Sequence, residues 1–120
     1  MPLQKQSVAI SNRIAALHRE HYGRGAGSVR TVIHAEYVVT LMDDPFTPAE
    51  KMTIARGEFG QVRAMRTMFQ DWMRESFSAA VEDATGRKVA GFFSQVCAEP
   101  PMSLEFFTLV PAHDGGSASV

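Results

Sequence analysis

Cysteine is almost absent from this 120-residue sequence, which contains only Cys97. A lone thiol cannot form an intrachain disulfide, so nothing requires an oxidising compartment. Net charge is also scarce, at −1 from 12 Lys and Arg against 13 Asp and Glu. That balance supplies no overall basic field for nucleic acid. We therefore expect no nucleic-acid partner.

Long apolar runs are missing as well. The first residues, Met1 to Gln6, lead into no apolar segment of the kind that a secretory signal needs. A run of about 18 apolar residues, the minimum for a membrane-spanning helix, occurs nowhere. These absences predict a cytoplasmic protein with no membrane span of its own.

The composition that is present suits a soluble globular protein. Hydrophobic residues make up 45% of the chain and charged residues 21%, both ordinary proportions. The length fits one domain of about 100–150 residues. We predict a single domain over residues 1–111 and a flexible tail over 112–120, where the residues are small and polar.

The first helix is expected to begin near Ser7. Its apolar face is set by spacings of four, three and four residues, at Ile10, Ile14, Leu17 and His21. Three glycines, Gly23, Gly25 and Gly27, end the pattern, because glycine adopts left-handed angles at little cost. At least one of Gly25 and Gly27 should have a positive φ.

A β-rich segment follows over residues 29–42. Fourteen residues are long for one strand, whose usual length is about 5–6. We therefore predict a hairpin that turns at His34-Ala35-Glu36, with a single bent strand as the competing interpretation, because the turn lacks Asn-Gly or Asp-Gly.

The clearest local signal is Thr47-Pro48-Ala49-Glu50. Thr47 can cap a helix, Pro48 suits its first position, and Glu50 can complete a capping box. Residues 58–84 then carry a long helical pattern that Thr85-Gly86 ends. Gly57 and Gly60 leave open whether residues 48–84 form one long helix or two with a kink.

Two further strands are predicted over Val89–Cys97 and Leu104–Val110, separated by tandem prolines that cannot lie in a central strand. The order is therefore α-β-β-α(-α)-β-β. It predicts an α+β fold, with an antiparallel sheet of about four strands in two hairpins packed against an N-terminal helix and a long central helix.

Both closing strands carry apolar residues on both faces. In the last strand, Leu104 and Phe106 point to one side while Phe107 and Leu109 point to the other. The preceding strand places Val89 and Phe93 opposite Phe92 and Val96. A sheet covered by helices on one face should alternate apolar and polar residues. We therefore predict a homodimer, unless the helices of one chain cover both faces.

Three patterns that resemble functional motifs fail on inspection. Glycines 23, 25 and 27 follow a helix, whereas a dinucleotide fingerprint opens one. His18 and His21 have a spacing that could hold a metal, but no second ligand pair accompanies them. Cys97 lacks a base nearby in the sequence and is best interpreted as a small buried hydrophobe. We thus predict no catalytic, cofactor-binding or metal-binding residue, and no enzyme activity.

Two surfaces on the long helical segment are candidates for binding. Its arginines share nearly one helical angle and could contact an anion or an acidic partner: Arg56, Arg63, Arg66 and Arg74. Its Met and aromatic residues are most simply a core face. The alternative is a Met-rich dimer or docking surface, which we assign to Met65, Met68, Trp72 and, from the last strand, Phe107.

Several short pieces of the sequence, spread over about residues 8–110, together resemble a known bacterial family. They are Tyr22-Gly23-Arg24-Gly25, Val29-Arg30-Thr31, Thr47-Pro48-Ala49-Glu50-Lys51, Gly60 with Val62 and Arg66, Val81 to Val89, and Glu105-Phe106-Phe107-Thr108-Leu109. The family is the C-subunit-like (MpsC-like) family of a sodium-translocating, membrane-potential-generating system, formerly a domain of unknown function. The resemblance implies a link to membrane components for cation movement or inorganic-carbon uptake, and it supplies no catalytic residues.

We therefore predict a soluble, non-enzymatic accessory or interaction module, auxiliary to a membrane cation or inorganic-carbon transport system. The alternative is a small-ligand or anion sensor that uses the arginine stripe.

Overall fold

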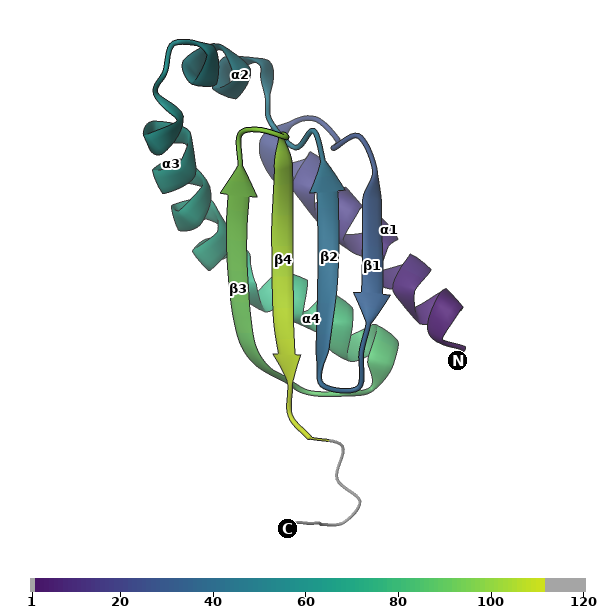
Figure 1. Ribbon diagram of the computed structural model, residues 1–120. Helices are drawn as coiled ribbons and strands as arrows, with labels where there is room; N and C mark the ends of the chain where they lie inside the picture. The colour runs from purple at the N-terminus through teal and green to yellow at the C-terminus, as the bar shows by residue number, and fades with distance from the viewer. Residues whose placement is uncertain (1, 112–120) are drawn as a thin grey trace.

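A computed structural model describes residues 2–111 and confirms the α+β class and the expected element order (Figure 1). The hairpin β1 (Val29–Ile33) and β2 (Tyr37–Asp43) follows helix α1 (Leu3–Tyr22). Three helices come next: α2 (Pro48–Ala55), α3 (Phe59–Trp72) and α4 (Arg74–Thr85). The hairpin β3 (Val89–Cys97) and β4 (Met102–Leu109) closes the fold. The predicted tail, 112–120, lies outside the described residues.

The two hairpins join into one antiparallel sheet of order β1-β2-β4-β3. The predicted turn at residues 34–36 is confirmed, and the amide of His34 donates to the carbonyl of Tyr37 at 2.8 Å. β4 begins at Met102, two residues before the predicted start. The two central strands, β2 and β4, pair from Tyr37 with Thr108 to Asp43 with Met102.

Helix α1 begins at Leu3, four residues before the predicted start. It ends at Gly23, whose φ is 78° and whose amide donates to the carbonyl of Arg19 at 2.9 Å. The prediction of a positive φ at Gly25 or Gly27 is wrong, since in the described residues the glycines with positive φ are Gly23, Gly57 and Gly86. Gly23 alone supplies the left-handed turn, and the two later glycines remain in ordinary conformations.

The middle of the chain forms three helices where one or two were expected. Thr47 caps α2 as predicted: its hydroxyl accepts from the amide of Glu50 at 3.2 Å, and Glu50 accepts from the amide of Thr47 at 2.8 Å. Gly57, with a φ of 80°, separates α2 from α3. The break between α3 and α4 falls at Met73, where no glycine or proline predicts it. Met73 is buried in the core, and tertiary packing outweighs the continuous helical pattern there.

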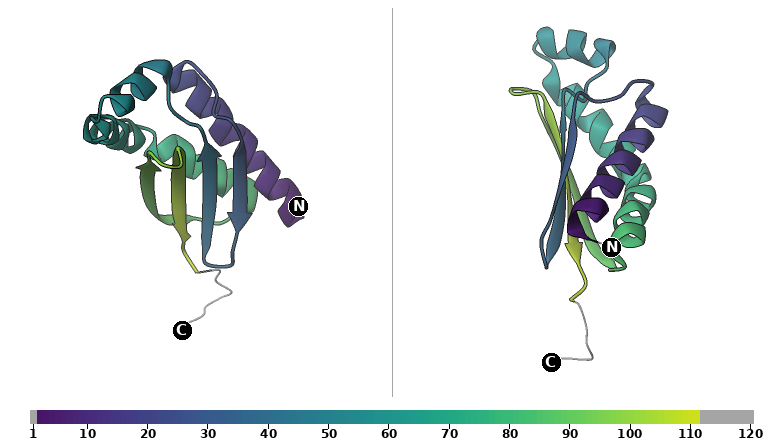
Figure 2. Two further views of the ribbon diagram at one scale, coloured as in Figure 1. Left: turned by 45° about the horizontal axis from the view of Figure 1, so that its top comes forward. Right: turned by 90° about the vertical axis from the view of Figure 1, so that its right-hand side faces the viewer.

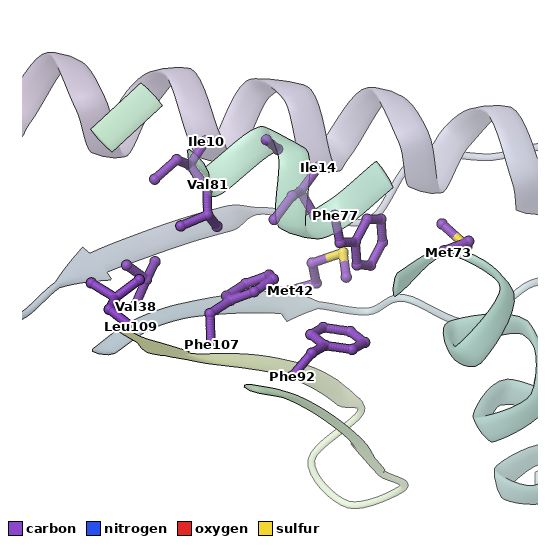
Figure 3. Packing of buried hydrophobic residues seen from close by; sticks show 11 residues of the cluster. Ile10, Ile14, Val38, Met42, Met73, Phe77, Val81, Phe92, Phe107 and Leu109 are labelled. Carbon is purple, nitrogen blue, oxygen red and sulfur yellow. The ribbon is translucent and has the colours of Figure 1, made fainter. Parts of the chain in front are cut away.

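Helices α1, α3 and α4 lie on one face of the sheet and α2 lies beyond its end, so the alternative in which the helices straddle the sheet is wrong (Figure 2, right). The covered face carries Val38, Phe107 and Leu109, which meet Ile10 and Ile14 of α1 and Phe77 and Val81 of α4 (Figure 3). The opposite face, the outer face, is formed by the alternate residues of each strand. We define it by its central residues, Val32, Val39, Leu41, Phe93, Leu104 and Phe106.

One strand departs from simple alternation. A register shift between Val89 and Gly91 places Val89 opposite Leu109 on the covered face, where it packs against the core. Phe93 lies on the outer face, so the prediction that Val89 and Phe93 share a side is wrong. A β-bulge inserts one residue and reverses the facing of everything before it.

Candidate functional site

The most highly connected polar residue in the described chain is Arg66 of α3, which is 1% exposed. Its Nε donates to Oε2 of Glu50 at 2.8 Å, and its Nη2 donates to Oε1 of Glu50 and to the carbonyl of Pro45, both at 2.6 Å. Its Nη1 lies 3.2 Å from Nε2 of His18, and its guanidinium lies 3.7 Å above the ring of Tyr22. Arg66 thus joins α1, α2 and the β2–α2 loop.

The pKa of each titratable group around Arg66 is shifted, and the guanidinium affects every one of these pKa values. Burial and the nearby guanidinium lower the pKa of His18 to about 4, so His18 is neutral and can accept from Arg66. Burial raises the pKa of Tyr22 to about 12, against the opposing effect of Arg66. Burial alone would raise the pKa of Glu50, but hydrogen bonds from Arg66 and Thr47 hold it below its usual value.

A second arginine, Arg24, also binds the loop between β2 and α2. Arg24 lies just after the end of α1 and donates to the carbonyl of Phe46, and its Nη2 lies 3.4 Å from Oδ2 of Asp44. The Gly23-Arg24-Gly25 segment therefore presents an arginine to the loop that precedes α2. Together, Arg24 and Arg66 fix the position at which the chain leaves the sheet and enters α2.

Next to this cluster lies a wholly buried carboxyl group, Glu105 of β4. Its Oε2 accepts from the hydroxyl of Ser103 at 2.6 Å and lies 3.5 Å from Nε2 of Gln70. Within residues 2–111, its Oε1 has no hydrogen-bond partner, and neither does Oε1 of Gln70. Burial raises the pKa of Glu105 to about 7, despite the hydrogen bond from Ser103. Glu105 can therefore exchange a proton near neutral pH.

A small cavity of about 10 Å³ lies between α3 and β3, beside this carboxyl group. Arg66, Gln70 and Ser94 are among its lining residues. This volume is close to the minimum for one water molecule. The buried polar groups thus form a closed cluster with no room for an organic ligand.

Sequence reasoning missed Glu105 and Gln70. The signal for Glu105 was available, because it alternates with Phe107 and Leu109 and so shares their covered face. Gln70 follows Arg66 by four residues on one helix face. Nothing in the sequence showed that these two side chains meet, since 35 residues separate them.

The four arginines of the predicted stripe do not form one strip. Arg66 is buried and bound to Glu50, whereas Arg56, Arg63 and Arg74 are exposed and lie on three different helical segments. Arg63 lies over the ring of Phe59 at 5.2 Å, and Arg74 lies 3.4 Å from Asp71. The common helical angle required one continuous helix, which the breaks after α2 and α3 remove.

The predicted docking residues divide in the same way. Met65, Met68 and Trp72 are exposed on α3, at 48%, 42% and 67%. Phe107 is fully buried and stacks near Phe92, with ring centroids 5.2 Å apart, so its assignment to a docking surface is wrong. Its neighbour Phe106 faces outward instead. Cys97, which we expected to be buried, is exposed at the end of β3.

The fold and the arginine-centred cluster define a small α+β domain with a four-stranded sheet, in which Arg66 bonds a helical arm, α2 and α3, to α1 and to the loop after β2. Residues 4–110 match the family described as the Na⁺-translocating membrane potential-generating system (MpsC), and the chain belongs to that family. No curated protein and no solved structure matches the chain. None of the described helices is both long and apolar enough to cross a membrane.

The residues that carry the family resemblance converge in space. Tyr22, Glu50 and Arg66 come from three separate sequence pieces and meet in the buried cluster. Arg24 donates a hydrogen bond to the adjoining loop, at the carbonyl of Phe46.

Proposed function

We propose that this protein is a soluble, non-enzymatic accessory module of a membrane system that moves cations or inorganic carbon, and that it works in the cytoplasm as a homodimer. Membership of the MpsC family supports the link to a membrane potential-generating system. The observation that carries the proposal further is the exposed apolar surface of the helical arm. Arg66 and Glu50 join the two helices of that arm by an ion pair of 2.6 Å.

The arm has the features of a docking surface for an acidic amphipathic helix. A groove of about 170 Å³ lies between α2 and α3, and its lining is half apolar and half polar: Ala49, Val62 and Met65 with Glu50, Thr53 and Gln61. Met68 and Trp72 extend the apolar surface along α3. Amphipathic helices bind such grooves through their apolar face, and methionine adapts to the partner's shape.

Charge at the groove favours an acidic partner. Arg56 and Arg63 are exposed at the arm, and neither forms an ion pair within residues 2–111. Exposed arginines steer acidic partners and strengthen their binding at low salt. We assign the occupant to a cytoplasmic acidic helix of the membrane component.

The proposal is tested in cells that lack this gene. We expect their Na⁺-dependent membrane potential, followed with a voltage-sensitive dye, to fall and to be restored by the wild-type chain. A Met68→Arg/Trp72→Arg variant should restore little of it. Val8→Arg, which changes an exposed apolar residue of α1, should restore it fully. Unchanged potential in the deletion strain would refute the accessory role.

The alternative function is an anion sensor built on the exposed arginines. Three of the four arginines remain accessible to an anion, since only Arg66 is buried. Titration with phosphate and with bicarbonate, followed by Trp72 fluorescence, distinguishes the two functions. Saturable binding that is lost in an Arg56→Ala/Arg63→Ala variant would favour the sensor.

A further inference from the structure

The outer face of the sheet is apolar and uncovered. Val32 and Phe93 are 59% and 61% exposed, and no helix within residues 2–111 crosses this side (Figure 2, right). Aromatic rings continue across it: Tyr37 stacks on Phe106 at 5.2 Å, and Phe106 lies 6.2 Å from Phe93. Contiguous apolar surface of this kind marks an interface.

The outer face is also nearly free of charge. Arg30 and Asp43 alternate with its apolar residues at one end, and they lie 3.6 Å from each other within the same chain. A face whose charges already compensate each other offers nothing to select a charged partner. A second copy of the same apolar face would cover it and would bring no unpaired charge.

In its central row, the outer face has one half with small side chains and one half with large ones. In the central row, Val32 pairs with Val39, Val39 with Phe106, and Phe106 with Phe93. β1 and β2 therefore contribute valines where β4 and β3 contribute phenylalanines. A twofold axis parallel to the strands would place each half over the opposite half of a second copy.

We propose that two copies of this chain pack outer face to outer face about that axis, with Val32 over the partner's Phe93 and Val39 over the partner's Phe106. Small side chains then meet large ones, as close packing requires. A twofold axis across the strands through this row would instead place valine over valine and phenylalanine over phenylalanine, so that small side chains meet small ones and large side chains meet large ones. The proposal deepens the homodimer of the proposed function by assigning its interface.

The available area is close to what such a dimer needs. The four strands hold five, seven, nine and eight residues, and at roughly 3.4 Å per residue and about 4.8 Å between strands they give a flat face of about 470 Å². Two copies bury about 950 Å² in total before side-chain relief is counted, near the threshold of about 1,000 Å² for a specific interface. Packed sheets lie about 10 Å apart, a gap that Phe106 and its neighbours can fill.

Cross-linking tests the assigned geometry. In a Cys97→Ser background, Val32→Cys protein is mixed with Phe93→Cys protein and treated with a short bis-maleimide. We expect linked dimers in the mixture and little linkage in either protein alone, since the axis separates identical edge strands. Equal linkage in all three samples, or none in the mixture, would overturn the assigned interface.

Solution mass tests the dimer itself. Light scattering of the wild-type chain should give twice the 13.2 kDa chain mass. Phe106→Arg should halve it, with circular dichroism confirming that the variant stays folded. Trp72→Arg, on the helical arm, should leave the mass unchanged. A wild-type monomer at micromolar concentration overturns the proposal while leaving the docking role of the arm to its own test. A dimer that Trp72→Arg breaks and Phe106→Arg spares would place the interface on α3 instead.

Discussion

The guanidinium of Arg66 meets the carboxylate of Glu50 through two roughly parallel hydrogen bonds, of 2.8 Å from Nε and 2.6 Å from Nη2. The two residues are 16 positions apart and belong to α3 and α2. Glu50 also completes the capping box of α2, so its carboxylate both caps that helix and binds Arg66 of α3. The pair holds α2 against α3 within the helical arm.

Removing Arg66 should therefore be costly. We expect Arg66→Ala to lower the free energy of unfolding by about 3 kcal/mol, because it leaves Glu50 without its main partner in a largely buried site. The double variant Arg66→Met/Glu50→Met should recover most of that loss, since no unpaired charge remains. Urea denaturation measures both values. Arg63→Ala, an exposed control on the same helix, should change stability by less than about 0.5 kcal/mol.

The cap of α2 is a second, smaller contribution. Thr47→Ala removes the acceptor for the amide of Glu50 and should cost about 1 kcal/mol. Thr67→Ala is the matched control, because its hydroxyl lies exposed within α3 and bonds to the carbonyl of Arg63. Equal unfolding midpoints for wild type and Thr47→Ala would contradict the prediction.

Two buried groups should give opposing pH dependences. Glu105 has a pKa of about 7 in the folded protein, raised above the ordinary 4.5 by burial. Its contribution to stability is thus full below pH 4.5 and is lost as pH rises through 7. His18 has a pKa of about 4, lowered from 6.5 by burial and by Arg66. Its contribution is full above pH 6.5 and is lost as pH falls through 4.

Variants separate these two effects. The stability of wild type relative to Glu105→Gln should fall by on the order of 3 kcal/mol as pH rises from 4.5 to 7. Relative to His18→Asn, it should fall as pH drops from 6.5 to 4. Denaturation series over this range measure both differences. A pH-independent difference for Glu105→Gln would mean that the carboxyl group keeps its ordinary pKa.

The two neighbouring phenylalanines of β4 should behave differently. Phe107 is fully buried, so we expect Phe107→Ala to lower the free energy of unfolding by about 3–5 kcal/mol. Phe106 lies on the outer face, and Phe106→Ala should chiefly raise the dissociation constant of the dimer, measured by dilution in analytical ultracentrifugation. Met68→Ala, on exposed α3, provides the control for both measurements.

Much of the fold could be predicted from local chemistry. The capping box at Thr47, the hairpin turn at His34-Ala35-Glu36 and the end of α4 at Gly86 depend on residues close together in the chain. The order of helices and strands followed from them. The four-residue error at the start of α1 arose because no capping side chain marks that end.

The candidate site could be predicted less well, since its residues are distant in sequence. Arg66 looked like a member of an exposed stripe because spacing gives a helical angle without telling which angle faces the core. The break at Met73 then removed the stripe altogether. The buried position of Phe107 depended in the same way on which face of the sheet the helices cover.

The sequence by itself therefore determined the elements, their order and the presence of apolar residues on both sheet faces, because propensity, capping and alternation act over a few residues. Only the tertiary structure decided that α1, α3 and α4 cover the same face, that a bulge turns Val89 inward and that Arg66 pairs with Glu50. These outcomes depend on contacts between distant segments, whose energies no local pattern contains.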